Sequence, residues 1–335
     1  MSMISSHTHL ATPDDFSDNC GFGLIAHIEG QASHDLVKTA IHSLSCMTHR
    51  GGVAADGKTG DGCGLLLAMP TEFFRTVANE QNLTISDNFA VGMVFTSLDA
   101  EKAAYSQQVL NEEIIAQDLE VAGWRDVPLD LDIVGDIGRE TLPDFKQVFV
   151  NASTDSEGKP LNAEDFNRKL FVARKKAEQR LVDDELFYVC SLSCQTIIYK
   201  GLVMPSDLPA FFLDLQDERL ASHIVVFHQR FSTNTLPRWP LAQPFRYLAH
   251  NGELNTITGN RNWSEARTPK LKSAKLPNLN ELTPLVNNTG SDSSSLDNML
   301  EVLISGGMNL FHSMSILVPP AWQNVDSMDM DLRAF

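Results

Sequence analysis

Cys20 is the strongest candidate nucleophile in this sequence of 335 residues. It opens a Cys-Gly-Phe-Gly run, in which the glycines leave backbone space around the sulfur. It also follows a polar leader, residues 1–19, and removal of that leader would give Cys20 a free α-amino group. Such an amine titrates near ~8 and a thiol near ~8.5, so the amine could accept the thiol proton without a separate histidine. The alternative is a buried structural thiol, the commoner fate of a cysteine.

A second group of candidates lies within residues 228–260, HQRFSTNTLPRWPLAQPFRYLAHNGELNTITGN. Arg230 follows an apolar strand-like segment, and a guanidinium fixed at a strand end suits the binding of a carboxylate. Asn251 and Gly252 end another predicted strand, YLAHNG. An asparagine amide beside a glycine N–H group suits an oxyanion hole for acyl transfer. The alternative is a polar surface loop.

Asp292 lies in a Gly-Ser-Asp-Ser segment that precedes a predicted helix. Its carboxylate could bind a substrate ammonium group. The alternative is a helix cap, in which Ser293, Ser294 or Ser295 would accept a hydrogen bond from the first turn.

Residues 52–59, GVAADGKT, satisfy the pattern of a phosphate-binding P-loop. That loop works only where it follows a strand and opens a helix, so that backbone N–H groups face the phosphates. Here a predicted helix precedes the segment, a further glycine-rich loop follows it, and Asp56 and Asp61 would repel phosphate. The sequence therefore argues against a nucleotide site.

The predicted elements indicate an α+β protein. Helices and strands do not alternate regularly, so two antiparallel sheets covered by helices are favoured over a doubly wound parallel sheet. Apolar spacing predicts helices at 34–48, 71–81, 99–119, 163–182, 294–305 and 307–316, and strands at 20–28, 65–69, 88–95, 147–150, 187–193, 196–200, 223–231 and 247–252.

Composition excludes several classes of protein. Lys and Arg number 26 against 43 Asp and Glu, so the net charge of −17 argues against nucleic-acid binding. No apolar run approaches the ~18–20 residues of a membrane span. No Lys or Arg precedes Lys38 and the N-terminus has no apolar core segment, so no secretory signal is expected. Five cysteines indicate a reducing, cytoplasmic compartment, with core packing expected for Cys190 and Cys194.

Taken together, these segments resemble the class II glutamine amidotransferases, which are N-terminal-nucleophile hydrolases, and among them the large subunit of glutamate synthase. The resemblance runs from about Asp18 to Phe335 and is most specific in DNCGFGLIAHIEG, ADGKTGDGCG, FHQRFSTNTLPRWPLAQPFRYLAHNGE and GSDSSSLDNMLE. It implies a propeptide at 1–19 and an amidotransferase domain at 20–335 that ends before its C-terminal part. The implied fold is a four-layer αββα sandwich, with two antiparallel sheets between helices.

The resemblance also implies a role for each candidate. Cys20 would be the nucleophile, and Asn251 and Gly252 the oxyanion hole. The two ends of glutamine would be held by Arg230, at the α-carboxylate, and by Asp292, at the α-ammonium. Arg50, in the HRG motif, would order the loop around Cys20, and Thr233 and Asn234 lie in the same substrate-binding turn.

The implied activity is hydrolysis of L-glutamine, with ammonia passed to 2-oxoglutarate by downstream synthase domains. Those domains would hold FMN and a [3Fe–4S] cluster, and a small flavoprotein subunit would supply electrons from NADPH. No cofactor or metal site is expected within residues 1–335. Two alternatives remain open: a non-catalytic remnant in which Cys20 stays blocked, and an amidotransferase that feeds another acceptor.

Overall fold

The computed structural model describes residues 21–154, 158–229, 236–252, 254, 256–319, 323, 325 and 327–334. Its strands are β1 (Phe22–Ala26), β2 (Thr59–Ala68), β3 (Phe89–Thr96), β4 (Glu120–Asp126), β5 (Asp144–Asn151), β6 (Tyr188–Ser193), β7 (Thr196–Val203) and β8 (Ile224–Gln229). Its helices are α1 (His34–Cys46), α2 (Thr71–Glu80), α3 (Ala100–Ile115), α4 (Asp136–Arg139), α5 (Ala163–Arg180), α6 (Leu208–Phe211), α7 (Thr258–Arg267), α8 (Asp292–Ser305), α9 (Leu310–Leu317) and α10 (Met330–Ala334).

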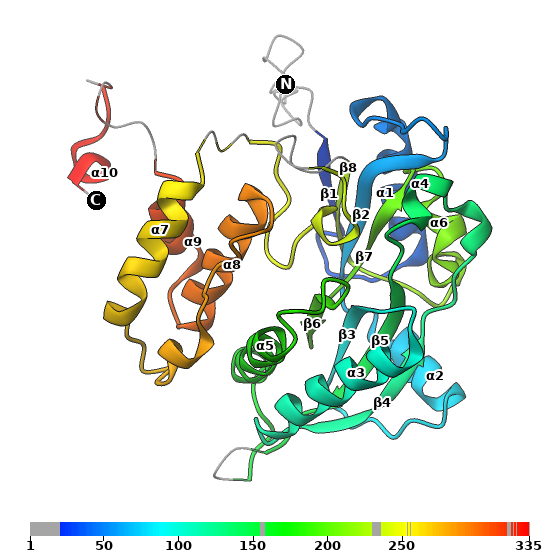
Figure 1. Ribbon diagram of the computed structural model, residues 1–335, viewed down its shortest axis with the longest axis horizontal. Coiled ribbons are helices and arrows are strands. Elements are labelled where there is room, and N and C mark those ends of the chain that lie inside the picture. Colours follow the sequence, from blue (N-terminus) through cyan, green and yellow to red (C-terminus); the bar gives the residue numbers. More distant parts are fainter. Residues whose placement is uncertain are drawn as a thin grey trace, which may run out of the picture.

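The strands form two antiparallel four-stranded sheets, in the orders β1-β8-β2-β7 and β4-β5-β3-β6. The consecutive strands β6 and β7 belong to different sheets, so the short connection between them carries the chain from one sheet to the other. Figure 1 shows the two sheets stacked, with helices around them. The α+β prediction with two antiparallel sheets between helices is confirmed.

Strand β3 shows how the sequence specifies the layers, because all eight of its residues are buried. Val91 and Met93 point into a core that includes side chains from the other sheet and from α1 and α2. Ala90 and Val94 point the opposite way, into a second core formed with α3 and α5. A strand covered on both faces reads as a continuous apolar run, which is why FAVGMVF was recognisable from sequence.

A helical lobe formed by α7, α8 and α9 lies beside the sheets, on the left of Figure 1. Leu276, Leu279, Leu282, Leu285 and Val302 form its small core, and Phe171 of α5 completes it. Helix α5 therefore contacts both the second sheet and the lobe. This packing holds the beginning of α8 at a fixed place relative to the strands.

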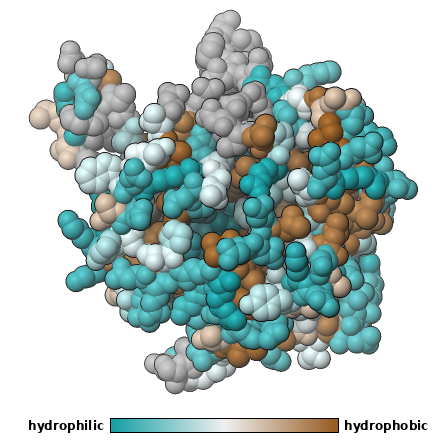
Figure 2. Space-filling model, in the orientation of Figure 1, coloured by the Kyte–Doolittle hydropathy of each residue, from teal (hydrophilic) through white to brown (hydrophobic). Residues whose placement is uncertain are grey.

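The surface is consistent with the acidic composition. Figure 2 shows a face that is largely hydrophilic, with hydrophobic side chains in small groups. Among the described residues, no helix is both long enough and apolar enough to cross a membrane.

Several parts of the secondary structure differ from the prediction, among them the short helices α4, α6 and α10, which were not predicted. Strand β4 went unrecognised because its residues are half-exposed, and its glycine at a β-bulge breaks the apolar alternation. Helix α7 also went unrecognised, since none of its residues is buried. Residues 247–252 were predicted to be a strand, which is wrong, because they form an irregular segment whose N–H groups bond to side chains.

Candidate functional site

Four of the predicted site residues, Cys20, Arg230, Thr233 and Asn234, lie outside the described residues. Their described neighbours are adjacent in the first sheet. The N–H group of Gln229 donates to the carbonyl of Gly21 over 2.7 Å, at the end of the β1–β8 pairing. The residue that follows Cys20 and the residue that precedes Arg230 are therefore hydrogen-bonded to each other.

Asn251 lies at the same place. A Cβ built on Gly21 would come within 3.1 Å of Asn251 Nδ2 and 3.2 Å of Asn251 Oδ1. The side-chain amide of Asn251 therefore sits against the backbone of the residue next to Cys20. This contact joins two segments that are about 230 positions apart in the sequence.

The segment that carries Asn251 and Gly252 is held by side chains rather than by a neighbouring strand. Buried Gln243 accepts a hydrogen bond from the His250 N–H group at 3.0 Å and donates to the His250 carbonyl at 3.3 Å. The N–H groups of Tyr247 and Leu248 donate to Asp297 Oδ1 of α8. These bonds satisfy the backbone locally and explain why no strand forms there.

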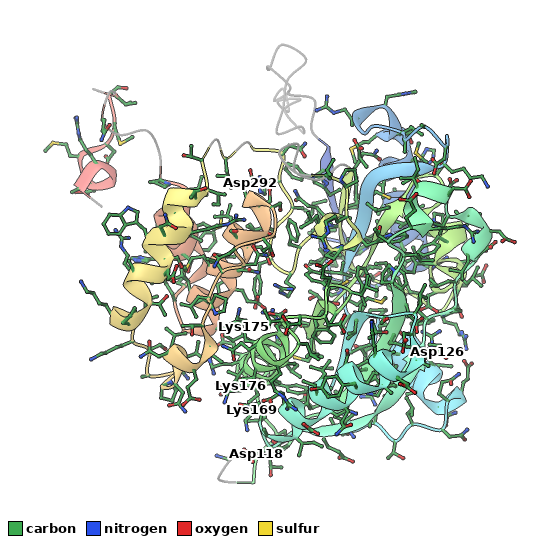
Figure 3. All side chains as sticks on the ribbon, in the orientation of Figure 1. Asp118, Asp126, Lys169, Lys175, Lys176 and Asp292 are labelled. Atoms are coloured by element: carbon green, nitrogen blue, oxygen red, sulfur yellow. The ribbon has the colours of Figure 1, made fainter. Side chains whose placement is uncertain are left out.

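Asp292 is the first residue of α8 and is only 7% exposed. Figure 3 shows it at the end of α8 that faces the strands. The cap of this helix is Ser291, whose hydroxyl accepts from the Ser294 N–H group, so the predicted caps Ser293, Ser294 and Ser295 are wrong. Asp292 itself accepts from the N–H group of Ser293 at 2.6 Å, which fixes its carboxylate at the helix end.

His250 connects Asp292 electrostatically to the oxyanion segment. Burial lowers the pKa of His250, while the negative charge of Asp292 and a hydrogen bond with the Gly252 backbone oppose that shift. The carboxylate of Asp292 is therefore within electrostatic range of the residue that precedes Asn251 and Gly252.

Arg50 ends a short 3₁₀ turn, Thr48–Arg50, that packs beside the same strand end. The amide of Gln229 donates to the Thr48 carbonyl over 3.5 Å and lies directly against Gly51. A side chain at Gly51 would collide with that amide, which accounts for glycine in the HRG motif. The motif therefore contacts the residue that precedes Arg230.

The glycine-rich segment at 52–59 is not a phosphate loop. Asp56 accepts hydrogen bonds from the Thr59 hydroxyl and N–H group, and these bonds hold the pKa of Asp56 below its usual range. Asp61 accepts from the Gly52 N–H group at 2.5 Å. Strand β2, not a helix, begins at Thr59. The local structure agrees with the argument against a P-loop, but residues 60–64, predicted to continue the glycine-rich loop, belong to β2.

The described cysteines divide by environment. Cys63 and Cys190 are fully buried, and burial raises the pKa of both thiols, to about 12 for Cys190. Cys194 is half-buried and packs against the second core, and Cys46 is exposed. Core packing is therefore confirmed for Cys190 and Cys194. The thiols of Cys63 and Cys190 stay protonated at neutral pH and are poor nucleophiles.

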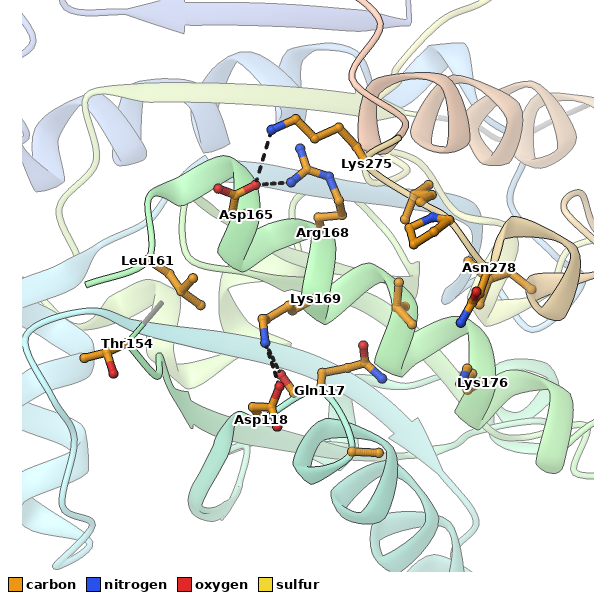
Figure 4. Close-up of a pocket in the computed structure, with 15 residues that line it drawn as sticks. Gln117, Asp118, Thr154, Leu161, Asp165, Arg168, Lys169, Lys176, Lys275 and Asn278 are labelled. Atoms are coloured by element: carbon orange, nitrogen blue, oxygen red, sulfur yellow. Dashed lines mark hydrogen bonds and ion pairs between the residues drawn. The ribbon is translucent and has the colours of Figure 1, made fainter. Parts of the chain in front are cut away.

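Two clefts border α5. A cleft of about 250 Å³ lies between α5, α8 and residues 244–249, directly before the oxyanion segment. A broader cleft of about 830 Å³ lies on another side of α5, away from Asp292, and is drawn in Figure 4. Its lining cations are paired: Lys169 lies 3.2 Å from Asp118, and Arg168 and Lys275 both contact Asp165. None of the predicted site residues is among its described lining residues.

Several residues at the site were missed from the sequence: His228, Gln243, His250, Arg246 and Asp297. His228 and His250 are part of the recognised phrases, so their position beside Arg230 and Asn251 was the available signal. Gln243, Arg246 and Asp297 also lie in recognised phrases, but nothing in the sequence shows that Arg246 and Asp297 meet, because their proximity depends on how α8 packs.

Comparison with known proteins agrees with this geometry. The family model described as glutamine amidotransferases class-II matches residues 20–335. The large chain of the NADPH glutamate synthase of Bacillus subtilis is 42% identical over 328 residues, which cover 97% of this chain and 21% of that protein. The chloroplastic/mitochondrial ferredoxin-dependent glutamate synthase 1 of Arabidopsis thaliana is 42% identical over 311 residues, covering 91% and 19%. The Azospirillum brasilense NADPH large chain is 40% identical over 316 residues, covering 92% and 20%. The chain thus spans about a fifth of the length of these relatives.

Proposed function

Because this chain belongs to the class-II glutamine amidotransferases, we propose that it hydrolyses the side-chain amide of L-glutamine to glutamate and ammonia. The observation that carries the proposal is the contact between Asn251 and Gly21, together with the Gln229–Gly21 hydrogen bond. These contacts bring the described neighbours of Cys20 and Arg230 to the proposed oxyanion donor. A nucleophile and an oxyanion hole serve amide hydrolysis, and a cation beside them suits recognition of the α-carboxylate of glutamine.

Each proposed residue has one role. Arg230 pairs with the α-carboxylate of glutamine, and Asp292 pairs with its α-ammonium. Thr233 and Asn234 line the same substrate-binding turn, and Arg50 orders the loop next to Cys20. The burial of Asp292 and its fixed orientation support its role, because a desolvated carboxylate binds a cation more strongly than an exposed one.

The reaction proceeds through a thioester. The Cys20 thiolate attacks the amide carbon, and the developing oxyanion is held by the Asn251 side chain and the Gly252 N–H group. The Cys20 α-amine, which took the thiol proton, returns it to the leaving nitrogen, and ammonia departs. Water then attacks the thioester, the carbon–sulfur bond breaks, and glutamate leaves with the thiol restored. This mechanism needs the α-amine free, so we propose that residues 1–19 are removed.

We further propose that the ammonia serves glutamate synthesis from 2-oxoglutarate in a longer enzyme, as the names of the relatives suggest. FMN and an iron–sulfur cluster would supply the reductive chemistry in other domains. Within the described residues no group of three or more His, Cys, Asp or Glu side chains is placed to hold a metal. NADPH through a small flavoprotein subunit is the proposed electron source, although similar relatives are ferredoxin-dependent.

Replacement of Cys20 tests this function. Cys20→Ala should abolish release of glutamate and ammonia from glutamine, whereas Cys46→Ala, which alters an exposed thiol on α1, should leave it unchanged. Both products are measured on the purified chain, and the intact mass shows where it begins. Glutamine hydrolysis by Cys20→Ala would contradict the proposal. An inactive chain that retains residues 1–19 would favour the non-catalytic alternative.

A further inference from the structure

We propose that His228 is a positioning residue that sets the orientation of the Asn251 amide in the oxyanion hole; this inference rests on the proposed function. His228 lies on β8 opposite Phe22, two positions after Cys20, and is 1% exposed. Its Nε2 atom is 2.8 Å from Asn251 Oδ1 and 3.1 Å from the carbonyl oxygen of His250. One ring nitrogen therefore contacts both the side chain of Asn251 and the backbone beside it.

The hydrogen at Nε2 follows from the chemistry of these partners. A backbone carbonyl can only accept, so Nε2 must carry a hydrogen and donate to His250. The same N–H group faces the Asn251 amide, and it can be satisfied there only by the oxygen, not by the NH₂ group. His228 thereby selects one of the two amide orientations.

That orientation is the productive one. With its oxygen held by His228, the Asn251 amide has its NH₂ group available to donate, and the amide as a whole lies against Gly21, the residue after Cys20. A rotated amide would present a carbonyl oxygen to the developing oxyanion, and two negative oxygens repel each other. His228 would therefore act only through Asn251 and would touch neither the substrate nor the reacting atoms.

His228 contacts both the His250 backbone and the Asn251 amide, and Gln243 shares only the first of these two contacts. It donates to the same His250 carbonyl and accepts from the His250 N–H group, so it also fixes the backbone. Among the described residues, His228 is the hydrogen-bond partner of the Asn251 side chain. Within the part of the chain that the structure describes, loss of the His228 donor would thus leave the His250 backbone held by Gln243 and the Asn251 amide without a group that fixes its orientation.

The test compares two substitutions of similar length. His228→Gln keeps an N–H donor where Nε2 lies, whereas His228→Met does not. With one oxyanion donor misoriented, kcat of His228→Met for glutamine should fall about 100-fold, and KM should change less than about threefold. His228→Gln should recover kcat to within about tenfold of wild type. His34, a buried histidine that bonds the Leu220 carbonyl at 2.9 Å, is the matched control, and His34→Met should keep kcat.

Rates are expressed per active site, titrated with an electrophilic glutamine analogue, and folding is monitored by circular dichroism. Equal kcat values for the Gln and Met variants, or a raised KM with unchanged kcat, would overturn the inference. If the Met variant does not fold, a folded but inactive Gln variant would overturn it, and an active one would support it. An inactive wild-type chain would instead refute the proposed function and the inference with it.

Discussion

Two buried ionic clusters in this protein differ in how completely their charges are satisfied. In the first cluster, Asp214 accepts two hydrogen bonds from Arg125, at 2.7 and 2.9 Å, and a third from the Tyr199 hydroxyl at 2.9 Å. Arg125 also donates to Gln147. Both oxygens of this carboxylate have charged or polar partners, and the cluster connects β4, β5 and β7.

In the second cluster, one buried carboxylate is not fully hydrogen-bonded. Asp297 Oδ1 accepts from two N–H groups, but Oδ2 has no hydrogen-bond partner among the described residues, and Arg246 Nη2 is 3.9 Å away. Arg246 instead donates to Glu301 at 3.0 Å, which also binds Arg174. Burial raises the pKa of Asp297 to about 6, against the opposing effect of Arg246.

The two clusters differ in hydrogen bonding because they lie in different parts of the fold. The first cluster connects strands that the proposed mechanism does not use, and complete pairing suits a structural role. The second joins the segment that leads to Asn251 with the helix that begins at Asp292. A buried polar atom without a partner is uncommon and calls for an explanation, and incomplete satisfaction is often found beside functional sites. We expect the first cluster to govern stability and the second to govern the pH response near the site.

The largest effect should come from Asp214→Asn. This change removes the charge but keeps the shape, so Arg125 is left buried without a counter-ion, at a cost of about 3–5 kcal/mol in the free energy of unfolding. Urea denaturation measures the loss, and kcat for glutamine should stay unchanged in the folded fraction. Glu80→Gln is the control, because the Glu80–Arg219 pair is half-exposed and such surface pairs contribute little to stability. Equal losses in the free energy of unfolding for Asp214→Asn and Glu80→Gln would contradict a stabilising role for the first cluster.

A smaller effect should come from Asp297 and should depend on pH. Between the ordinary pKa of 3.8 and the folded value of about 6, the folded protein binds more protons at Asp297 than the unfolded chain. Its contribution to stability therefore decreases as the pH rises through this window, by up to about 1 kcal/mol per pH unit. Asp297→Asn keeps an acceptor for Tyr247 and Leu248 but cannot titrate.

Relative to Asp297→Asn, the wild-type free energy of unfolding should consequently fall between pH 4 and pH 6 and level off above it. Denaturation curves at several pH values measure the difference between the two proteins. Parallel stability curves for wild type and Asp297→Asn would show that the carboxyl group titrates normally.

The sequence predicted the parts of this fold that have a strong apolar pattern. Strand β3, buried on both faces, and helix α5, with apolar residues at helical spacing, were both predicted. Strand β4 and helix α7 were missed because they bury little. The segment before Asn251 was misread as a strand, since its bonds to Gln243 and Asp297 depend on tertiary packing and leave no local pattern.

The candidate site could be predicted where its functional residues belong to short sequence motifs. Asn251 and Asp292 were identified by residue type within those motifs, although the strand predicted to end at Asn251 does not form. The structure places Asn251 against Gly21, and the charge of Asp292 acts on the neighbouring His250. His228 was present in a recognised phrase, but its role depends on a contact across 23 residues. Asp297 contacts residues 49 and 50 positions away, which no spacing rule anticipates.

The most direct test of the central claim is the mass of the chain after incubation with an electrophilic analogue of glutamine. The proposed mechanism predicts a chain that begins at Cys20 and carries one adduct on that residue, with Cys46 unmodified and with glutamine protecting against the reaction. An adduct on another cysteine, or an adduct on a chain that still retains residues 1–19, would contradict an N-terminal cysteine as the nucleophile.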